Sequence, residues 1–180
     1  DKEWENANIF ALGENDWKSE KAWSGITASG MTKWDDEYLY VAITVDENVH
    51  RMTKLHSEIW NGDGVQFGFD PNRFFETTTG SQYNEIGIAK NTETNAVLTW
   101  KWGTSGMVDD INMALVGGQY AVERLDGKTI YEMAIPWSVI APNVDIQYCR
   151  MVGFSVVLNE DDGECRIGCL EYMIGIGLYK

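Results

Sequence analysis

The stretch Tyr38-Leu39-Tyr40-Val41-Ala42-Ile43-Thr44-Val45 has the alternation that decides the fold class. Leu39, Val41, Ile43 and Val45 stand two residues apart, and successive side chains of an extended chain point to opposite faces. The four aliphatic side chains therefore share one face, as in a β-strand with one buried side. The stretch predicts a strand of a sheet that packs on one face.

The same period of two recurs along most of the chain. We expect further strands at residues 31–34, 65–69, 84–90, 96–102, 120–125, 129–135, 152–158 and 166–173. Turn-forming pairs such as Asp126-Gly127 and Asp162-Gly163 separate them, and only residues 136–140 are typical of a helical turn. The sequence predicts an all-β fold, an antiparallel β-sandwich or jelly roll with about nine or more strands and minimal helix. We expect a single domain over residues 1–180.

The charge balance and the length of the apolar runs exclude two classes of partner. The chain has 180 residues, with 14 basic and 28 acidic side chains and a net charge of −14. Nucleic-acid binding needs clustered Lys and Arg that displace counterions from phosphates. No apolar run approaches the roughly 20 residues that span a bilayer. We therefore expect neither nucleic acid nor membrane as a partner.

Aromatic residues are abundant in this chain, which holds eight Trp, eight Tyr and six Phe. A core takes some of them, because aromatic side chains bury large areas. Eight indole N–H groups are difficult to satisfy inside one small core, so surplus rings favour a flat-faced ligand such as a sugar. The alternative, that all eight Trp lie in the core or in an interface, stays open at this point.

Three cysteines, Cys149, Cys165 and Cys169, do not form a disulfide framework, because an odd number leaves at least one thiol unpaired. Cys165 and Cys169 stand four residues apart on a predicted strand. That spacing separates their Cα atoms by about 13 Å, which exceeds disulfide reach. A zinc site would need a second close pair and a nearby His. We expect free, mostly buried thiols.

Four segments follow one another in a familiar order and spacing. They are Trp34-Asp35-Asp36-Glu37-Tyr38-Leu39-Tyr40-Val41-Ala42 with Val45-Asp46-Glu47-Asn48-Val49-His50, then Ile59-Trp60-Asn61-Gly62-Asp63-Gly64-Val65-Gln66, then Tyr131-Glu132-Met133-Ala134-Ile135-Pro136-Trp137, and last Asn159-Glu160-Asp161-Asp162-Gly163 with Gly175-Ile176-Gly177. Together they resemble the family 9 carbohydrate-binding modules, which belong to the DOMON-like β-sandwiches. The resemblance covers residues 33–180.

The resemblance implies a non-catalytic, secreted or cell-surface module that binds plant or other polysaccharide chains, often at a chain end. Such modules are usually attached to a glycan-degrading enzyme or a surface protein, so we expect a monomeric part of a larger polypeptide. The family clamps a sugar between two Trp rings. Its first ring and the polar residue six positions later fall on Trp60 and Gln66, and its second ring falls on Tyr172, with Cys169 nearby.

Four further residues are candidates for ligand contact on the pattern alone. Tyr83 and Glu85 face together on a predicted strand and offer a ring and a hydroxyl acceptor. Trp100 and Trp102 share one strand face, where they form either core or a sugar platform.

The resemblance also implies structural calcium, which takes six to eight oxygen ligands at about 2.3–2.6 Å. Acidic turns can supply such oxygens, and the candidate ligands are Asp35, Asp36, Asp46, Asp161 and Asp162. None of these turns has the spacing of an EF-hand loop, and solvated turns are the alternative for each.

Two other classes of function stay open. Small jelly-roll glycoside hydrolases have this length, and they need two carboxylates about 5–9.5 Å apart across a cleft. Some DOMON-type domains bind haem through Met and His, and the chain has His50 and His56 beside seven Met. Neither class has a motif in this sequence as specific as the four segments above.

Overall fold

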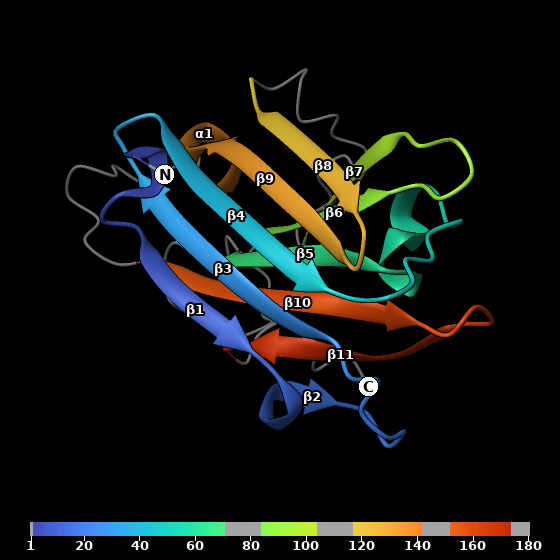
Figure 1. Ribbon diagram of the computed structural model, residues 1–180. Helices are drawn as coiled ribbons and strands as arrows, with labels where there is room; N and C mark the ends of the chain where they lie inside the picture. The colour runs from blue at the N-terminus through green and yellow to red at the C-terminus, as the bar shows by residue number, and fades with distance from the viewer. Residues whose placement is uncertain (1, 71–83, 104–116, 142–151, 174–180) are drawn as a thin grey trace.

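The computed structural model of the chain describes residues 2–70, 84–103, 117–141 and 152–173. In these residues, eleven strands form two antiparallel sheets that pack face to face (Figure 1). In spatial order, one sheet contains β1 (Asn8–Leu12), β3 (Thr27–Trp34), β4 (Tyr38–Asp46), β9 (Lys128–Pro136) and β8 (Gln119–Leu125). The other contains β2 (Trp17–Lys18), β11 (Arg166–Tyr172), β10 (Gly153–Asp161), β5 (Gly64–Asp70), β6 (Asn84–Lys90) and β7 (Val97–Gly103). The predicted all-β sandwich is confirmed.

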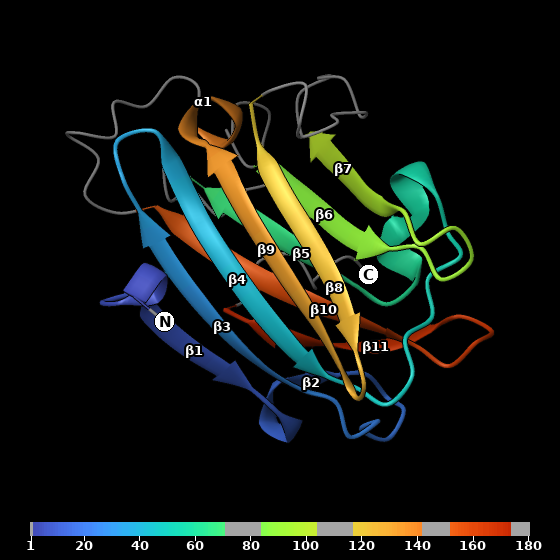
Figure 2. The ribbon, with the colours of Figure 1, turned by 45° about the horizontal axis from the view of Figure 1, so that its top comes forward.

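Helix is confined to short segments of the described chain. These are α1 (Trp137–Ile140) and the 3-10 helices η1 (Lys2–Trp4), η2 (Glu14–Asp16) and η3 (His56–Asn61). Figure 2 shows η3 beside the edge of the six-stranded sheet that β7 forms. In the described residues, no helix has the length and apolar character needed to cross a bilayer.

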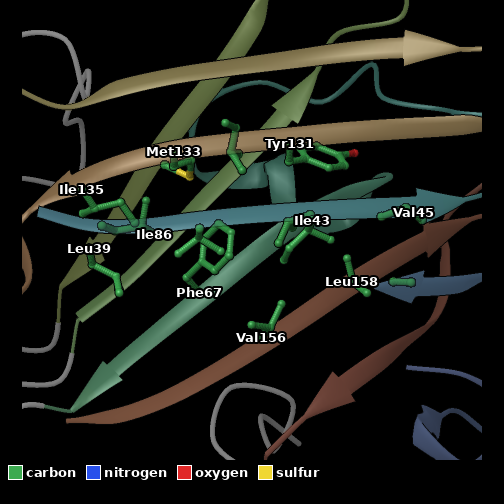
Figure 3. Packing of buried hydrophobic residues seen from close by; sticks show 14 of the residues in the cluster. Leu39, Ile43, Val45, Phe67, Ile86, Tyr131, Met133, Ile135, Val156 and Leu158 are labelled. Atoms are coloured by element: carbon green, nitrogen blue, oxygen red, sulfur yellow. The ribbon is translucent and has the colours of Figure 1, made fainter. Parts of the chain in front are cut away.

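The core lies between the two sheets and follows the alternation of their strands. Leu39, Val41, Ile43 and Val45 of β4 are all buried, as the sequence predicts. Figure 3 shows Leu39, Ile43 and Val45 facing the inward side chains of the other sheet, among them Phe67. Burying an aliphatic side chain of this size stabilises the fold by about 1.5–3 kcal/mol. The two inner faces together therefore hold the sandwich closed.

The register of the six-stranded sheet fixes which side chains face away from the core. Gln66 of β5 stands opposite Val157 on β10 and Gly87 on β6, and Gly87 stands opposite Trp100 on β7. Residues directly opposite each other across a ladder share one face of the sheet. Since the neighbouring Phe67 is in the core, this row lies on the outer face.

A second, smaller apolar cluster covers part of that outer face. It comprises Met52, Ile59, Ala89 and Trp100, with Leu98 and Trp102 packed against it. The ring of Trp102 lies over Gly87, where an added Cβ atom would come within 2.6 Å of its Cη2 atom. Gly87 therefore makes room for the ring, and the cluster fixes η3 to the sheet.

Candidate functional site

Trp60 is presented on the outer face of the six-stranded sheet by η3. Its neighbour Ile59 is buried against Trp100, and the Trp102 indole Nε1 donates a hydrogen bond to the Ser57 carbonyl at 3.2 Å. These contacts hold one side of η3 down. Trp60 itself keeps 38 % of its surface exposed, so its ring is held in place and accessible.

Arg166, at the start of β11, joins Trp60 to the sheet. The Cζ atom of its guanidinium lies 6.0 Å from the centroid of the Trp60 ring, within the range of a cation–π contact. Its backbone N–H donates to Asn61 Oδ1 at 3.2 Å, next to Trp60 in the chain. The buried Nε of Arg166 has no hydrogen-bond partner among the described residues.

Three polar side chains form a chain of hydrogen bonds across β6, β5 and β10. Gln66 Nε2 donates to a carboxylate oxygen of Glu85, and Asn159 Nδ2 donates to Gln66 Oε1 at 2.6 Å. All three residues are buried. The remaining amide oxygen, Asn159 Oδ1, has no partner in the part of the chain that the structure describes. A buried acceptor without a partner costs free energy, so this oxygen is suited to receive a hydroxyl.

The carboxyl group of Glu85 has an unusual proton affinity. Burial raises its pKa to about 7, against the hydrogen bond from Gln66 and the charge of Arg166, which both lower it. The group is therefore poised between the ionised and the protonated form near neutral pH.

The structure brings together most of the ligand residues that the sequence predicts. Gln66 and Glu85 lie on the outer face. The positive charge of Arg166 lowers the pKa of Glu85, and its guanidinium also lies over the Trp60 ring. Trp100 and Trp102 pack beneath η3, so they support the site as a small core. Tyr83 lies outside the described residues.

Tyr172 is not brought to Trp60. It stands opposite Val156, which is part of the core, so its ring points between the sheets. There it stacks on Phe10 of β1, with the ring centroids 4.5 Å apart and an angle of 22° between the planes. The expectation of a clamp formed by Trp60 and Tyr172 is therefore not met, because the strand register places the two rings on opposite faces of the sheet.

The carboxylates predicted to bind calcium are spread over separate places. Asp35 accepts the backbone N–H groups of Glu37 and Tyr38 at 2.8 Å each and the Tyr40 hydroxyl at 2.8 Å. These bonds lower the pKa of Asp35 and fix the turn between β3 and β4. Asp36 is exposed in the same turn, and neither residue belongs to a group of three or more ligating side chains among the described residues.

Asp161 and Asp162 likewise shape a turn. Asp161 Oδ1 accepts the backbone N–H of Gly163 at 2.5 Å, and Asp162 Oδ1 accepts that of Glu164 at 3.0 Å. Asp162 Oδ2 also forms an ion pair with Lys21 at 3.3 Å. Asp46 lies elsewhere, at the end of β4, with Lys128 Nζ 3.8 Å from its Oδ1. The five predicted carboxylates do not form one cluster.

A buried cluster that the sequence did not indicate lies at this end of the sandwich. Glu47, His50 and Asp63 have ligand atoms within 4.8 Å of one another. Protein donors already occupy these oxygens: Glu47 Oε1 accepts from Arg124 at 3.1 Å, and Asp63 Oδ1 accepts the Asp161 N–H at 2.7 Å. Calcium prefers a set made of oxygens, so a group that includes a His ring, and whose carboxylates already accept from Arg124 and from a backbone N–H, does not fit it.

The same cluster leaves no ring nitrogen of His50 free. His50 Nδ1 lies 3.0 Å from Glu47 Oε1, and Nε2 lies 2.8 Å from the Lys90 carbonyl oxygen. Burial alone lowers the pKa of His50, but the hydrogen bond and charge of Glu47 outweigh it and raise the pKa. A haem ligand needs an unoccupied nitrogen, so His50 does not fit that role.

A pocket of about 380 Å³ adjoins the buried cluster and is lined by Ser24, Gly25, Ile26, Asp46, Glu47, Asn48, Val49, Arg51, Gly127 and Glu160. Glu160 is 8 % exposed, and its Oε2 has no hydrogen-bond partner among the described residues. Burial, followed by the charge of Glu47, raises the pKa of Glu160 to about 7. The pocket thus combines hard oxygen donors with three carboxyl groups, which outnumber the one guanidinium in its lining, that of Arg51.

The whole described chain corresponds to a known family of domains. The family model described as carbohydrate family 9 binding domain-like matches residues 1–173. The chain belongs to this family. The module is therefore a non-catalytic carbohydrate-binding module.

Relatives of the module include one curated protein and two solved structures. Endo-1,4-beta-xylanase A of Thermotoga maritima is 28 % identical over 148 residues, which are 81 % of this chain and 12 % of the xylanase. A family 9 module from Caldicellulosiruptor kristjanssonii in complex with cellotriose has a TM-score of 0.68 at 18 % identity, covering 98 % of this chain and 78 % of that one. A structure from the same organism in complex with glucose has a TM-score of 0.64 at 17 % identity, covering 98 % and 80 %. These likenesses agree with the sandwich fold.

Proposed function

We propose that the module binds a neutral glucan chain on the outer face of the six-stranded sheet, with Trp60 as the stacking platform. The exposed Trp60 ring can cover one face of a pyranose and exclude water from it. Net charge −14 disfavours polyanionic glycans. The complexes of the similar modules with cellotriose and glucose support a glucan as ligand.

The observation that carries this proposal is a pair of unsatisfied polar atoms connected to Trp60. Arg166 Nε offers a donor and Asn159 Oδ1 offers an acceptor, and both are buried without a partner in the described residues. Both atoms have almost no exposed surface, so the side chains over them must shift before neighbouring sugar hydroxyls can accept from the first and donate to the second. An aromatic surface with a few polar groups that fix the orientation of the ligand is the usual composition of a small-molecule site.

The test is isothermal titration of the protein with cellotriose, xylotriose and a uronate trisaccharide. We expect saturable binding of cellotriose, weaker binding of xylotriose and none of the uronate. A reducing-sugar assay on the matching polysaccharides should show no release. Cellotriose binding that is absent at millimolar concentration would refute the proposal.

We further propose that calcium binds in the pocket at the end of β4 and β10. Glu160 and Asp46 would supply carboxylate oxygens there, with Asn48 and the Ser24 hydroxyl beside them. The support is the unpartnered Glu160 Oε2, since a buried carboxylate oxygen is stabilised by a cation. The exposed turn at Asp36 has no such feature, so it serves as the control position.

The test compares melting temperatures in calcium and in chelator. Ion binding at a hundredfold excess over Kd stabilises a native state by about 2.7 kcal/mol, which is several degrees for a domain of this size. Glu160→Gln should abolish the calcium shift, and Asp36→Asn should retain it. A melting temperature of the wild-type protein that ignores both calcium and chelator would refute the site.

The location of the module and its attachment to other domains are part of the same proposal. The proposal includes secretion or display at the cell surface and attachment to a glycan-degrading enzyme. The 12 % share of the xylanase that aligns with this chain supports such an arrangement. Fractionation of the source cells and light scattering of the isolated module test the location and the monomeric state.

A further inference from the structure

A chain of two hydrogen bonds links the carboxylate of Glu85 to the unpartnered oxygen of Asn159. Gln66 Nε2 donates to Glu85, and Asn159 Nδ2 donates to Gln66 Oε1 at 2.6 Å. Each amide has a donor end and an acceptor end, so the direction of one bond fixes the direction of the next. The atom of Asn159 left over is its acceptor, Oδ1.

The ionised form of Glu85 imposes this direction. A carboxylate only accepts hydrogen bonds, so Gln66 must turn its NH₂ group toward Glu85 and its oxygen toward Asn159. A protonated Glu85 has a hydroxyl donor, which favours the Gln66 oxygen on that side. Gln66 then turns its NH₂ group toward Asn159, and Asn159 in turn leaves its own NH₂ group unpaired.

We infer that Glu85 is a positioning residue, which sets through Gln66 whether Asn159 presents an acceptor or a donor to the bound sugar. This inference rests on the proposed function and adds a specificity determinant to that site. On this inference Asn159 contacts the sugar hydroxyl, and Glu85 acts on Asn159 through one intervening side chain, that of Gln66. Binding of a hydroxyl that donates to Asn159 Oδ1 then requires the ionised form of Glu85.

The surroundings of Glu85 allow this change near neutral pH. Among the described residues, the strand register and the bounds of η3 place these charged and titratable side chains on the outer side of the sheet and on η3: Lys18, Asp70, Asp161, Arg166, Cys169, Glu171, His56 and Glu58. Of these, Arg166 acts on Glu85 and favours its ionised form. Burial opposes it more strongly, so the pKa of Glu85 lies at about 7. Both directions of the hydrogen-bond chain are therefore accessible between pH 6 and pH 8.

The first arm of the experiment uses the protein without ligand. The side-chain amide signals of Gln66 and Asn159 are followed by NMR from pH 5 to pH 9. We expect both to shift together with one midpoint near pH 7, and Glu85→Gln to remove that shift. The control Glu132→Gln, an exposed position on β9, should leave it unchanged. Amide signals of the folded wild-type protein that stay constant with pH would overturn the inference.

The second arm measures cellotriose binding at pH 6 and pH 8. If only the ionised form binds, the affinity falls with its population, about tenfold between pH 8 and pH 6. Glu85→Gln should make the affinity independent of pH, and Glu132→Gln should retain the wild-type profile. Titrating amides with a pH-independent affinity would refute the role of Asn159 while leaving the glucan site intact. Cellotriose binding that is absent at every pH would overturn both the glucan site and this inference.

Discussion

Tyr172 stacks on Phe10, with 4.5 Å between the ring centroids, and this contact joins the last strand of one sheet to the first strand of the other. The ring thereby contributes to the closure of the sandwich at the β1 and β11 side. A residue at the sequence position of a family clamp ring is thus used for stability in this chain.

We therefore expect Tyr172→Ala to lower stability and to leave sugar affinity nearly unchanged. The lost aromatic pair and lost packing of a half-buried ring should cost about 1–3 kcal/mol of the free energy of unfolding. Tyr172→Phe keeps the ring and serves as the control, with a loss below about 1 kcal/mol. Urea denaturation measures both. A tenfold loss of cellotriose affinity in folded Tyr172→Ala would contradict this assignment.

Trp60 should carry the largest single share of sugar affinity. Stacking on one aromatic ring is worth about 1–3 kcal/mol in nucleic-acid complexes, and the same scale for a pyranose predicts a fivefold to over a hundredfold loss in Trp60→Ala. Trp34→Ala is the matched control, because Trp34 is 59 % exposed on β3 of the other sheet. Calorimetric titration of each variant with cellotriose measures the two affinities. Equal affinities of the two variants would show that the stacking ring lies elsewhere.

Gln66 and Arg166 contribute polar contacts, and removal of either should weaken binding less than removal of Trp60. Gln66→Ala removes two hydrogen bonds, the one donated to Glu85 and the one accepted from Asn159, and so interrupts the link between those residues. We expect a loss of about 0.5–1.5 kcal/mol of binding free energy in that variant. Arg166→Lys keeps the charge but loses the planar guanidinium over the Trp60 ring, so it separates the two effects.

Glu85 should make the fold less stable as the pH rises. Its pKa of about 7 lies above the usual value of 4.5, so the folded state holds the proton more tightly than the unfolded chain. Stability from this group is complete below about pH 4.5 and is lost as the pH rises toward 7. The amide in Glu85→Gln cannot ionise, so the stability of this variant relative to the wild type should increase as the pH rises across this range. Melting curves at pH 5 and pH 8 that show a constant difference would exclude the effect.

The two described cysteines should differ in reactivity. Cys165 is exposed and Cys169 is buried, and both are free thiols, as the sequence predicts. Burial raises the pKa of Cys169 and lowers its fraction of reactive thiolate. Alkylation followed by peptide mapping should label Cys165 in the native protein and Cys169 only after denaturation. Cys149 lies outside the described residues. Native labelling of Cys169 at the rate of Cys165 would contradict its burial.

The strands with clear alternation could be predicted from the sequence. The strand predicted at residues 84–90 begins and ends at the same residues as β6. β1 could not, because only Phe10 and Leu12 point inward while Ile9 is 78 % exposed and breaks the pattern. The alternation also indicates that Tyr172 points inward, because it stands two residues after the core residue Leu170. The resemblance to the family placed the Tyr172 ring beside Trp60, on the outer face of the sheet. The strand register places it on the inner face instead.

The candidate site could be predicted only in part, because its partners meet through the fold. Trp60 and Gln66 lie close together in the chain, and a motif reveals them. Arg166 reaches Trp60 from 106 residues away, as its contact to Asn61 across 105 residues shows. The pocket beside Glu160 likewise joins segments from four parts of the chain. Such contacts follow from strand order, which local patterns do not determine.

The fit of the Trp102 ring over Gly87 has a consequence for the evolution of this module. A Cβ atom at position 87 would press against the ring, so the two positions cannot vary independently. Among homologous chains we expect correlated substitution, in which any larger residue at position 87 accompanies a smaller one at position 102. Because the ring also bonds to Ser57 of η3, such a double change would move the Trp60 platform. Gly87 thus limits the changes in ligand preference that can evolve in related modules.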